Sequence, residues 1–304
     1  MVSVGNLHWG GTGKTPLTAA IAADLRDRGL GVSILTRGYK SSGRGVRIVS
    51  TGEGPLLGPR VAGDEPVLLA GRLPGVSVVV GPDRHQAGHH ALERLPQAPD
   101  VFLLDDGFSH LRLHRDVDLL VFPLSDPFAG GRLPPSGRLR EPLAASKRAH
   151  AALLSGDGAE NGTELAEALR PHGFTGPGFA APTRVDLART DDDRPVPPGT
   201  SVLLVSAVAR PAEVARSARG LGYEIAATVT FPDHHPYPRE SLDLLRRRLA
   251  ETEADLVLTT EKDWVKLLGR LDPPVARLPL TAEPEGAFFE WLAGRLDDAT
   301  QGRA

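Results

Sequence analysis

The stretch LHWGGTGKTP, residues 7–16, contains residue types that bind phosphate groups. A complete phosphate-binding loop has a glycine, four further residues, and then Gly-Lys followed by Ser or Thr. Gly13, Lys14 and Thr15 match the second half of this pattern, but His8 stands where the first glycine is required. The alternative is a glycine-rich turn that contains a lysine by chance. The elements around the stretch must decide between these two interpretations.

The flanking segments predict a βαβ unit. Residues 2–6 are typical of a buried strand, residues 14–29 of an amphipathic helix closed by Gly29, and residues 31–40 of a second strand. This order puts the N-terminus of a helix and a run of backbone N–H groups at the loop, where phosphates bind. We therefore interpret the segment as a phosphate-binding loop. Its residues are Gly10, Gly11, Thr12, Gly13, Lys14 and Thr15.

Two adjacent carboxylates follow a later apolar strand. The segment LLDDGFSH, residues 103–110, puts Asp105 and Asp106 at the carboxyl end of the strand predicted over 100–107. In enzymes with a phosphate-binding loop, an acidic residue at such a place holds Mg²⁺ together with the Ser or Thr of the loop. The pair therefore predicts a magnesium site with Thr15. The alternative is a helix cap next to a turn aspartate.

Four further segments carry polar residues whose role composition cannot decide. Asp64 and Glu65 precede an apolar helical run, where a capping role would suffice. His234 and His235 lie in a proline-flanked stretch that reads as a polar turn. The loop over 130–142 could bind an anionic substrate through Arg138 and Arg140, or could be a solvated connection, and TTEKDW (259–264) could be a helix cap. These alternatives stay open on spacing alone.

The alternation of apolar runs with helical segments predicts an α/β fold. Strands are expected over 76–81, 100–107, 116–124 and 148–155, with a helix over 83–95. A Pro/Gly-rich interval over 171–200 reads as a boundary with a possible short pair of linker strands. The alternation then resumes, with one strand expected over 275–280. We therefore expect two α/β/α domains with mostly parallel sheets: 1–175, a linker over 176–200, and a smaller domain over 201–304 that closes a cleft.

Composition is that of an ordinary globular protein and excludes several classes of function. Of 304 residues, 40% are hydrophobic and 24% charged, and the net charge of −3 gives no reason to expect a nucleic-acid partner. No cysteine is present, which excludes disulfides and thiolate chemistry. Only five of the 35 basic residues are lysines, so Lys14 is unusual where it stands. The strand before the loop starts abruptly, and we expect that an N-terminal piece is missing.

Seven motifs, in order, resemble the tetraacyldisaccharide 4'-kinase (lipid A 4'-kinase) family. They are VGNLHWGGTGKTP, TRGYK, GDEP, DDGFSH, RLPPSGRLREP, FPDHH and TEKD, and together they span residues 2 to about 268. The resemblance implies a P-loop NTPase-like first domain. It also implies transfer of the γ-phosphate of ATP, with Mg²⁺, to the 4'-hydroxyl of a tetraacylated glucosamine disaccharide at the cytosolic face of the inner membrane. That family's own loop also lacks the first glycine.

The resemblance also implies roles for particular residues. Asp64 matches the catalytic carboxylate of the family and His234 its partner, with Lys14 and Thr15 at phosphate and Mg²⁺. Further matching positions are the metal and active-site residues Asp105, Asp106, His110 and Glu141, and the cleft positions Tyr39, Arg84 and Arg140. Phosphoryl transfer depends mainly on positioning, charge neutralisation and a base near the attacking hydroxyl, which agrees with this set.

The chain departs from the family pattern at several places. Ser109 replaces a glutamine, FAGG (128–131) and LPPSGRLRE (133–141) differ from the usual loops, and SAVARP (206–211) replaces a glycine-rich turn. The family's N-terminal membrane helix is absent from this sequence. These departures concern the acceptor and the membrane more than the nucleotide. We expect a peripheral protein whose partner is the lipid A disaccharide precursor, with no obligate protein partner evident.

Two other classes of function compete with this interpretation. One is a phosphotransferase or ATPase that acts on another small-molecule or glycolipid acceptor. An ATPase of the chromosome-partitioning type is disfavoured, because its loop needs a lysine where Trp9 stands. The other is a degenerate relative that only binds nucleotide and a partner. Loss of Lys14 or Asp64 would favour it, and both are present.

Overall fold

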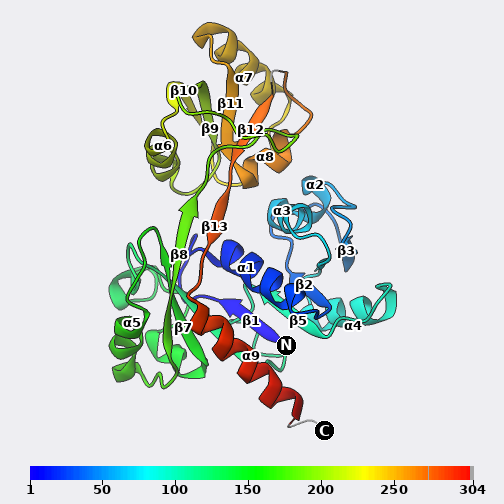
Figure 1. Ribbon diagram of the computed structural model, residues 1–304, viewed down its shortest axis with the longest axis vertical. Helices are drawn as coiled ribbons and strands as arrows, with labels where there is room; N and C mark the ends of the chain where they lie inside the picture. The colour runs from blue at the N-terminus through cyan, green and yellow to red at the C-terminus, as the bar shows by residue number, and fades with distance from the viewer. Residues whose placement is uncertain (273, 302–304) are drawn as a thin grey trace.

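Two β-sheets organise the chain into a larger and a smaller unit, shown at the bottom and top of Figure 1. The computed structural model describes residues 1–272 and 274–301. The larger sheet has nine strands in the order β13-β8-β7-β6-β1-β5-β2-β4-β3, and the smaller has four in the order β10-β9-β11-β12. Among the strands of these described residues, only the edge strands β13 and β3 pair antiparallel to their neighbours. The predicted α/β class with mostly parallel sheets is thereby confirmed.

The strands of the larger sheet are buried at its centre, as expected where helices cover both faces, and partly exposed toward its edges. They are β1 (Val2–Gly5), β2 (Val32–Thr36), β3 (Arg47–Ser50), β4 (Ser77–Val80), β5 (Val101–Asp105), β6 (Val117–Pro123), β7 (Ala151–Gly156), β8 (Gly178–Val185) and β13 (Leu280–Ala282). Those of the smaller sheet are β9 (Ser201–Ser206), β10 (Glu224–Thr230), β11 (Leu256–Thr260) and β12 (Val275–Leu278). The edge strand β3 was not predicted from sequence.

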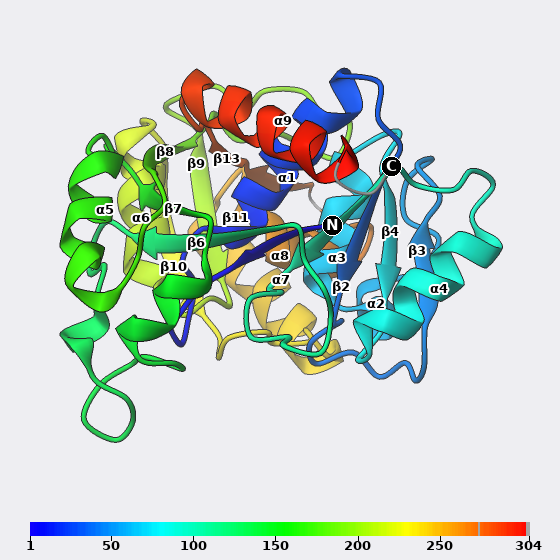
Figure 2. The same ribbon diagram turned by 90° about the horizontal axis from the view of Figure 1, so that it is seen from below.

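Helices pack on the faces of both sheets. They are α1 (Lys14–Asp27), α2 (Pro59–Ala62), α3 (Asp64–Arg72), α4 (Arg84–Arg94), α5 (Gly162–Leu169), α6 (Pro211–Gly220), α7 (Arg239–Thr252), α8 (Glu261–Leu267) and α9 (Gly286–Gln301), with short 3₁₀ turns over 129–131, 143–148 and 170–172. Helices α1 and α9 lie side by side on one face of the larger sheet, where Leu17, Ile21, Phe288 and Leu292 join one core (Figure 2). Helix α4 packs on the opposite face through Ala87 and Ala91.

Strand β1 lies at the point where the order of the larger sheet reverses. It pairs with β5 on one side and with β6 on the other. In open parallel sheets the crevice at the carboxyl ends of such strands is the usual ligand site. The loop between β1 and α1 and the residues after β5 both lie at this edge.

The two units are joined by a pair of strands, of which only one lies in the interval where a pair of linker strands was expected. Strand β8 falls in the interval predicted as a linker, and it extends the larger sheet beside β7. The chain returns from the smaller unit through β13, which pairs with β8 (Figure 1). Residues 275–280, expected to form one strand, are split at Pro279 between β12 and β13, which belong to different sheets. Helix α9, expected in the second domain, packs on the larger sheet.

No helix within the described residues is long and apolar enough to cross a membrane.

Candidate active site

The loop between β1 and α1 has the backbone that a phosphate site requires. Gly13 has φ +81° and directly precedes the helix, and a Cβ there would lie 2.4 Å from Oγ of Ser155. Only glycine fits this position without strain. The Asn6 side-chain amide donates to Oγ1 of buried Thr12 at 2.9 Å and braces the loop. The N-terminus of α1, with its free N–H groups, opens directly after this turn.

Lys14, the first residue of α1, carries a largely buried ammonium group. Its Nζ lies 3.5 Å from Oδ1 of Asp106, and its side chain is 12% exposed. Burial lowers the pKa of Lys14, while the charge of Asp106 opposes this shift. Arg140 donates to Oδ2 of Asp106 at 3.0 Å and, through Nε, to the carbonyl of His8 at 2.6 Å. Two cations therefore converge on one carboxylate beside the loop.

Asp105 ends strand β5 and is buried against α1. Its Oδ1 accepts a hydrogen bond from Oγ1 of Thr18 at 3.2 Å. Burial, together with the negative charges of Glu65 and Asp106, raises the pKa of Asp105 to about 7. A buried carboxylate whose pKa is raised by neighbouring carboxylates is a place where a bound cation would be stabilising.

The structure brings Asp64 and His234 into contact across the two units. Nδ1 of His234 lies 2.9 Å from Oδ2 of Asp64. Burial opposes ionisation of Asp64, but the hydrogen bond to His234 and the charges of His234, Lys266 and Lys262 lower its pKa to about 2. The hydrogen bond to Asp64 raises the pKa of His234 above its usual 6.5, and burial counteracts part of this rise. The pair is therefore most stable as an ion pair.

His234 adopts a backbone conformation unusual for a residue with a side chain. Its φ is +63°, and its N–H donates to the carbonyl of Ala207 at 3.2 Å. Such backbone strain persists where the surrounding structure holds it. The ring of Tyr39 lies edge-on to the His234 imidazole with centroids 5.4 Å apart, and Lys40 donates to the Asp233 carbonyl at 3.3 Å. The segment after β2 thus covers the histidine from the larger unit.

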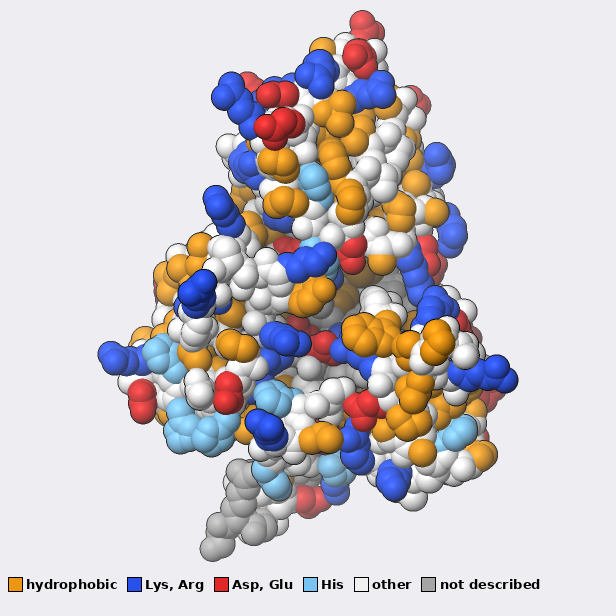
Figure 3. All heavy atoms as spheres, turned by 180° about the vertical axis from the view of Figure 1, so that it is seen from behind, with side chains coloured by type: hydrophobic (Ala, Val, Ile, Leu, Met, Phe, Trp, Pro, Cys, Tyr) orange, Lys and Arg blue, Asp and Glu red, His pale blue; other side chains and the backbone are white. Residues whose placement is uncertain are grey.

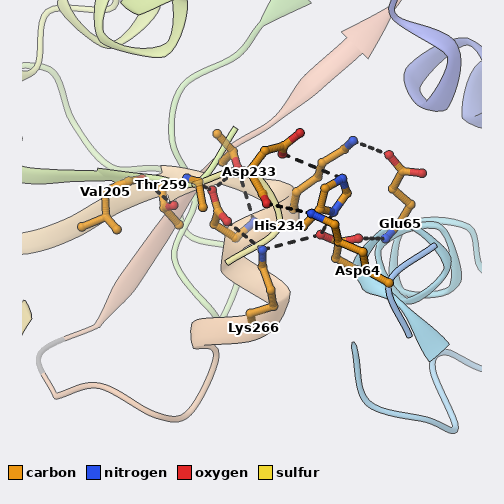
Figure 4. A network of polar contacts seen from close by, with 12 residues as sticks. Asp64, Glu65, Val205, Asp233, His234, Thr259 and Lys266 are labelled. Atoms are coloured by element: carbon orange, nitrogen blue, oxygen red, sulfur yellow. Dashed lines mark hydrogen bonds and ion pairs between the residues drawn. The ribbon is translucent and has the colours of Figure 1, made fainter. Parts of the chain in front are cut away.

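Helix α8 of the smaller unit docks on α3, the helix that begins with Asp64. Lys262 pairs with Glu65, Lys266 Nζ lies 3.5 Å from Oδ2 of Asp64, and Arg72 at the other end of α3 lies 3.2 Å from Glu261. Figure 4 shows the first two contacts and the Asp64–His234 pair in one network. In the space-filling view, basic and acidic side chains gather around the hollow between the two units (Figure 3).

Arg84 and His110 form a second group at the same edge of the larger sheet. The Arg84 guanidinium is buried and donates to the carbonyls of Gly81 and Pro82, both at 3.2 Å. The backbone N–H of Arg84 points to Nε2 of His110 at 3.4 Å. Burial and the positive charge of Arg84 lower the pKa of His110, so its imidazole is neutral at pH 7.

Two predicted site residues are engaged elsewhere. Glu141 lies 2.5 Å from Arg148 and accepts a hydrogen bond from Ser109 at 2.6 Å, while Arg138 pairs with Asp126. Within residues 1–272 and 274–301 no three His, Cys, Asp or Glu side chains are grouped so as to hold a metal ion. A cation at Asp105 and Asp106 would therefore take its remaining ligands from the Thr15 hydroxyl, from substrate phosphates and from water, as Mg²⁺ commonly does.

Sequence reasoning gave no chemical role to the α8 residues in this network. The TEKD segment was interpreted as a possible helix cap, and Thr260 does cap α8, accepting from the Asp263 N–H at 3.3 Å. Its lysines have a second role beside Asp64 and Glu65. The rarity of lysine could have revealed this, because four of the five lysines lie in or beside the site: Lys14, Lys40, Lys262 and Lys266.

Comparison with known proteins agrees with this geometry. The family model of LpxK, tetraacyldisaccharide-1-P 4'-kinase, matches residues 1–297. The chain belongs to this family. A tetraacyldisaccharide 4'-kinase of Anaeromyxobacter dehalogenans is 43% identical over 284 residues, which cover 91% of this chain and 73% of that protein. One of Geobacter metallireducens is 42% identical, with 88% and 78% covered.

A solved structure of the same family shares the fold. The crystal structure of LpxK from Aquifex aeolicus in complex with ATP matches with a TM-score of 0.75 and 32% sequence identity. The match covers 97% of this chain and 88% of that one. The tetraacyldisaccharide 4'-kinase family predicted from seven short motifs is therefore confirmed, and so is the kinase class.

Proposed function

We propose that this protein transfers the γ-phosphate of ATP to the 4'-hydroxyl of a tetraacylated glucosamine disaccharide 1-phosphate. The observation that carries the proposal is the Asp64–His234 contact of 2.9 Å, made across the two units. This contact places a histidine base, paired with a carboxylate, at the same sheet edge as Lys14 and Asp106. An ammonium group beside a carboxylate, as in these two residues, is typical of a phosphate-binding site. The family's name and the relative solved with ATP support both substrates.

The larger unit would bind and orient the nucleotide. The backbone N–H groups of residues 10–15 would bind the β- and γ-phosphates, and Lys14 would neutralise their charge. Thr15 and Asp105 or Asp106 would hold Mg²⁺, which supplies charge neutralisation as the phosphoryl group moves. The crowding of carboxylates at Asp105 favours such a cation. Glu141 would contribute only after leaving Arg148.

The Asp64–His234 pair would accept the proton of the attacking hydroxyl. When His234 is neutral, its imidazole can accept one proton, and the hydrogen bond to Asp64 stabilises the imidazolium that forms. Tyr39 lies beside His234 and Arg140 beside Asp106, so these two residues and the nearby Arg84 would orient an anionic sugar phosphate. Arg138 and His110 would assist at the margin of the same site.

The smaller unit would act as a closing element. Its contribution to catalysis is His234, whereas the other proposed catalytic residues come from the larger unit. We place the smaller unit at residues 186–279, between the two strands β8 and β13 that connect it to the larger sheet. The acceptor carries four acyl chains, so we place the protein at the cytosolic face of the inner membrane, bound peripherally.

Incubation of the full chain with γ-labelled ATP, Mg²⁺ and the tetraacyldisaccharide 1-phosphate tests the proposal. We expect label on the lipid, dependence on Mg²⁺, and loss of transfer in Asp64→Asn. Label released only as inorganic phosphate, with none on the lipid under any condition, would overturn it in favour of an ATPase. Label on a shorter sugar phosphate in preference to the lipid would favour a phosphotransferase with another acceptor.

A further inference from the structure

Lys266 is a buried lysine that has no role in the proposed phosphate site. It lies on α8, and the residue is 8% exposed. Its Nζ lies 2.9 Å from Oδ1 of Asp263, 3.5 Å from Oδ2 of Asp64 and 5.4 Å from the centre of the Tyr237 ring. Lysine is almost never this buried unless its charge is paired. Two carboxylates and an aromatic face therefore hold one ammonium group between the two units.

Asp263 connects this lysine to the backbone that carries His234. Its side chain is fully buried, and its Oδ2 accepts hydrogen bonds from the N–H of Ala207 at 2.8 Å and from Oγ1 of Thr260 at 3.0 Å. The carbonyl of Ala207 in turn accepts the N–H of His234 at 3.2 Å. One buried carboxylate thus supports the strained backbone at His234 on one side and orients Lys266 on the other.

Asp263 is connected to both members of the Asp64–His234 pair. Asp263 reaches His234 through Ala207, and it reaches Asp64 through Lys266. Figure 4 shows Lys266 below His234 with its ammonium directed at Asp64. The carboxylate of Asp64 is therefore shared between an imidazole and an ammonium group, both from the smaller unit.

We propose that Lys266, oriented by Asp263, is a positioning residue that holds Asp64 beside His234 and makes this pair bind a proton less tightly. The role in catalysis rests on the proposed function, whereas the effect on His234 does not. An ammonium group that shares the carboxylate lowers the affinity of the His234 imidazole for a proton, because its positive charge opposes that of the imidazolium and the shared carboxylate stabilises the imidazolium less. Without it, the pair would keep its proton up to a higher pH and would act as a base over a narrower pH range.

Other charged groups also act on the pair and must be kept unchanged in a test. They are Lys262 on α8, Glu65 on α3, Asp233 in the loop of His234, and Lys40 beside Tyr39. None of them is altered by substitution at position 266. The variant Lys266→Met removes the charge and preserves most of the volume of the side chain.

The titration of the His234 ring, followed by NMR on the full chain, tests the proposal without lipid. His234→Gln assigns the signal. We expect Lys266→Met to raise the apparent pKa of His234 by about one unit. In the lipid assay, kcat should fall at acid pH, and the midpoint of this fall (the acid limb) should move to higher pH by the same amount. This gives about a tenfold loss of kcat below the limb, with the KM for ATP changed less than about twofold.

Control variants separate this role from a general structural one. Arg248→Met removes an exposed cation from α7, where it pairs with Glu251, and should leave both the titration and the pH limb unchanged. Asp263→Asn/Lys266→Met removes both charges, so no buried carboxylate is left without its cation, and should shift His234 as Lys266→Met does. An unchanged His234 titration in both Lys266 variants overturns the proposal. Absence of lipid phosphorylation by the wild-type protein refutes the proposed function alone.

Discussion

The Nδ1 atom of His234 lies 2.9 Å from the Oδ2 atom of Asp64, although 170 positions separate the two residues in the chain. The aspartate opens α3 in the larger unit, and the histidine follows β10 in the smaller one. A base that depends on contact between two units exists only when they are docked. Activity should therefore be sensitive both to residues at the pair and to residues that hold the units together.

Replacement of Lys14 by alanine should abolish transfer while the fold is retained. The substitution removes a cation from the β/γ-phosphate site, whereas the backbone N–H groups remain. We expect kcat/KM to fall by about 10³-fold or more, with weakened binding of a fluorescent ATP analogue. Lys147→Ala, on the short turn before β7, is the matched control and should behave as wild type. Full turnover by Lys14→Ala would refute the phosphate-binding role of the loop.

Gly13→Ala should damage the loop through strain, because φ is +81° and the new methyl group would meet Oγ of Ser155 at 2.4 Å. We expect a loss of about 1–3 kcal/mol in the free energy of unfolding, together with weaker nucleotide binding. Gly11→Ala adds the same methyl group where no heavy atom lies within 4 Å, and it should be close to neutral for stability. Chemical denaturation measures both, and equal stabilities would contradict the strain argument.

The pH dependence of kcat should report the His234 imidazole. The hydrogen bond to Asp64 raises the pKa of His234 above 6.5. Below that value the pair already carries its proton and cannot accept another, so kcat should rise with pH through a limb above pH 6.5. His234→Asn should remove the limb and lower kcat by about 10²- to 10⁴-fold. A rate independent of pH between 5 and 9 in the wild-type protein would argue against the pair as the base.

Docking on anionic vesicles should be weak and carried mostly by exposed apolar residues. Three of the four arginines in the 132–148 segment are paired with acidic side chains: Arg138, Arg140 and Arg148. Trp9 is 64% exposed and directly precedes the phosphate-binding loop, and Leu133 is 44% exposed in the 132–148 segment. The N–H of Trp9 donates to the carbonyl of Arg138, which brings the two segments together. Trp9→Ala/Leu133→Ala should reduce co-sedimentation at low salt, and Leu92→Ala on α4 should not. Equal binding by both variants would place the docking surface elsewhere.

Local sequence patterns were sufficient for the elements and for the phosphate-binding loop. Short-range preferences predicted β1 and α1 correctly. They come from the run VSVGN, from the glycines before Lys14 and from the amphipathic residues after it. Asp105 and Asp106 were also expected at the end of a strand, because an apolar run followed by acidic residues marks the carboxyl edge of a parallel sheet. These features depend on neighbours in the chain.

Long-range pairing decided what local patterns left open. The sequence indicated a possible pair of linker strands over 171–200, but not that β8 would pair with β13, nearly a hundred residues later, or that Pro279 would divide one apolar run between two sheets. In the same way, Asp64 alone reads as a helix cap and His234 as a turn residue. Only their approach in space desolvates both groups, makes an ion pair of them and gives Lys266 a charge to balance. The sequence alone determined which residues could do chemistry. The tertiary structure decided which of them act on one another, because charge and hydrogen-bond interactions depend on distance in space and not on position in the chain.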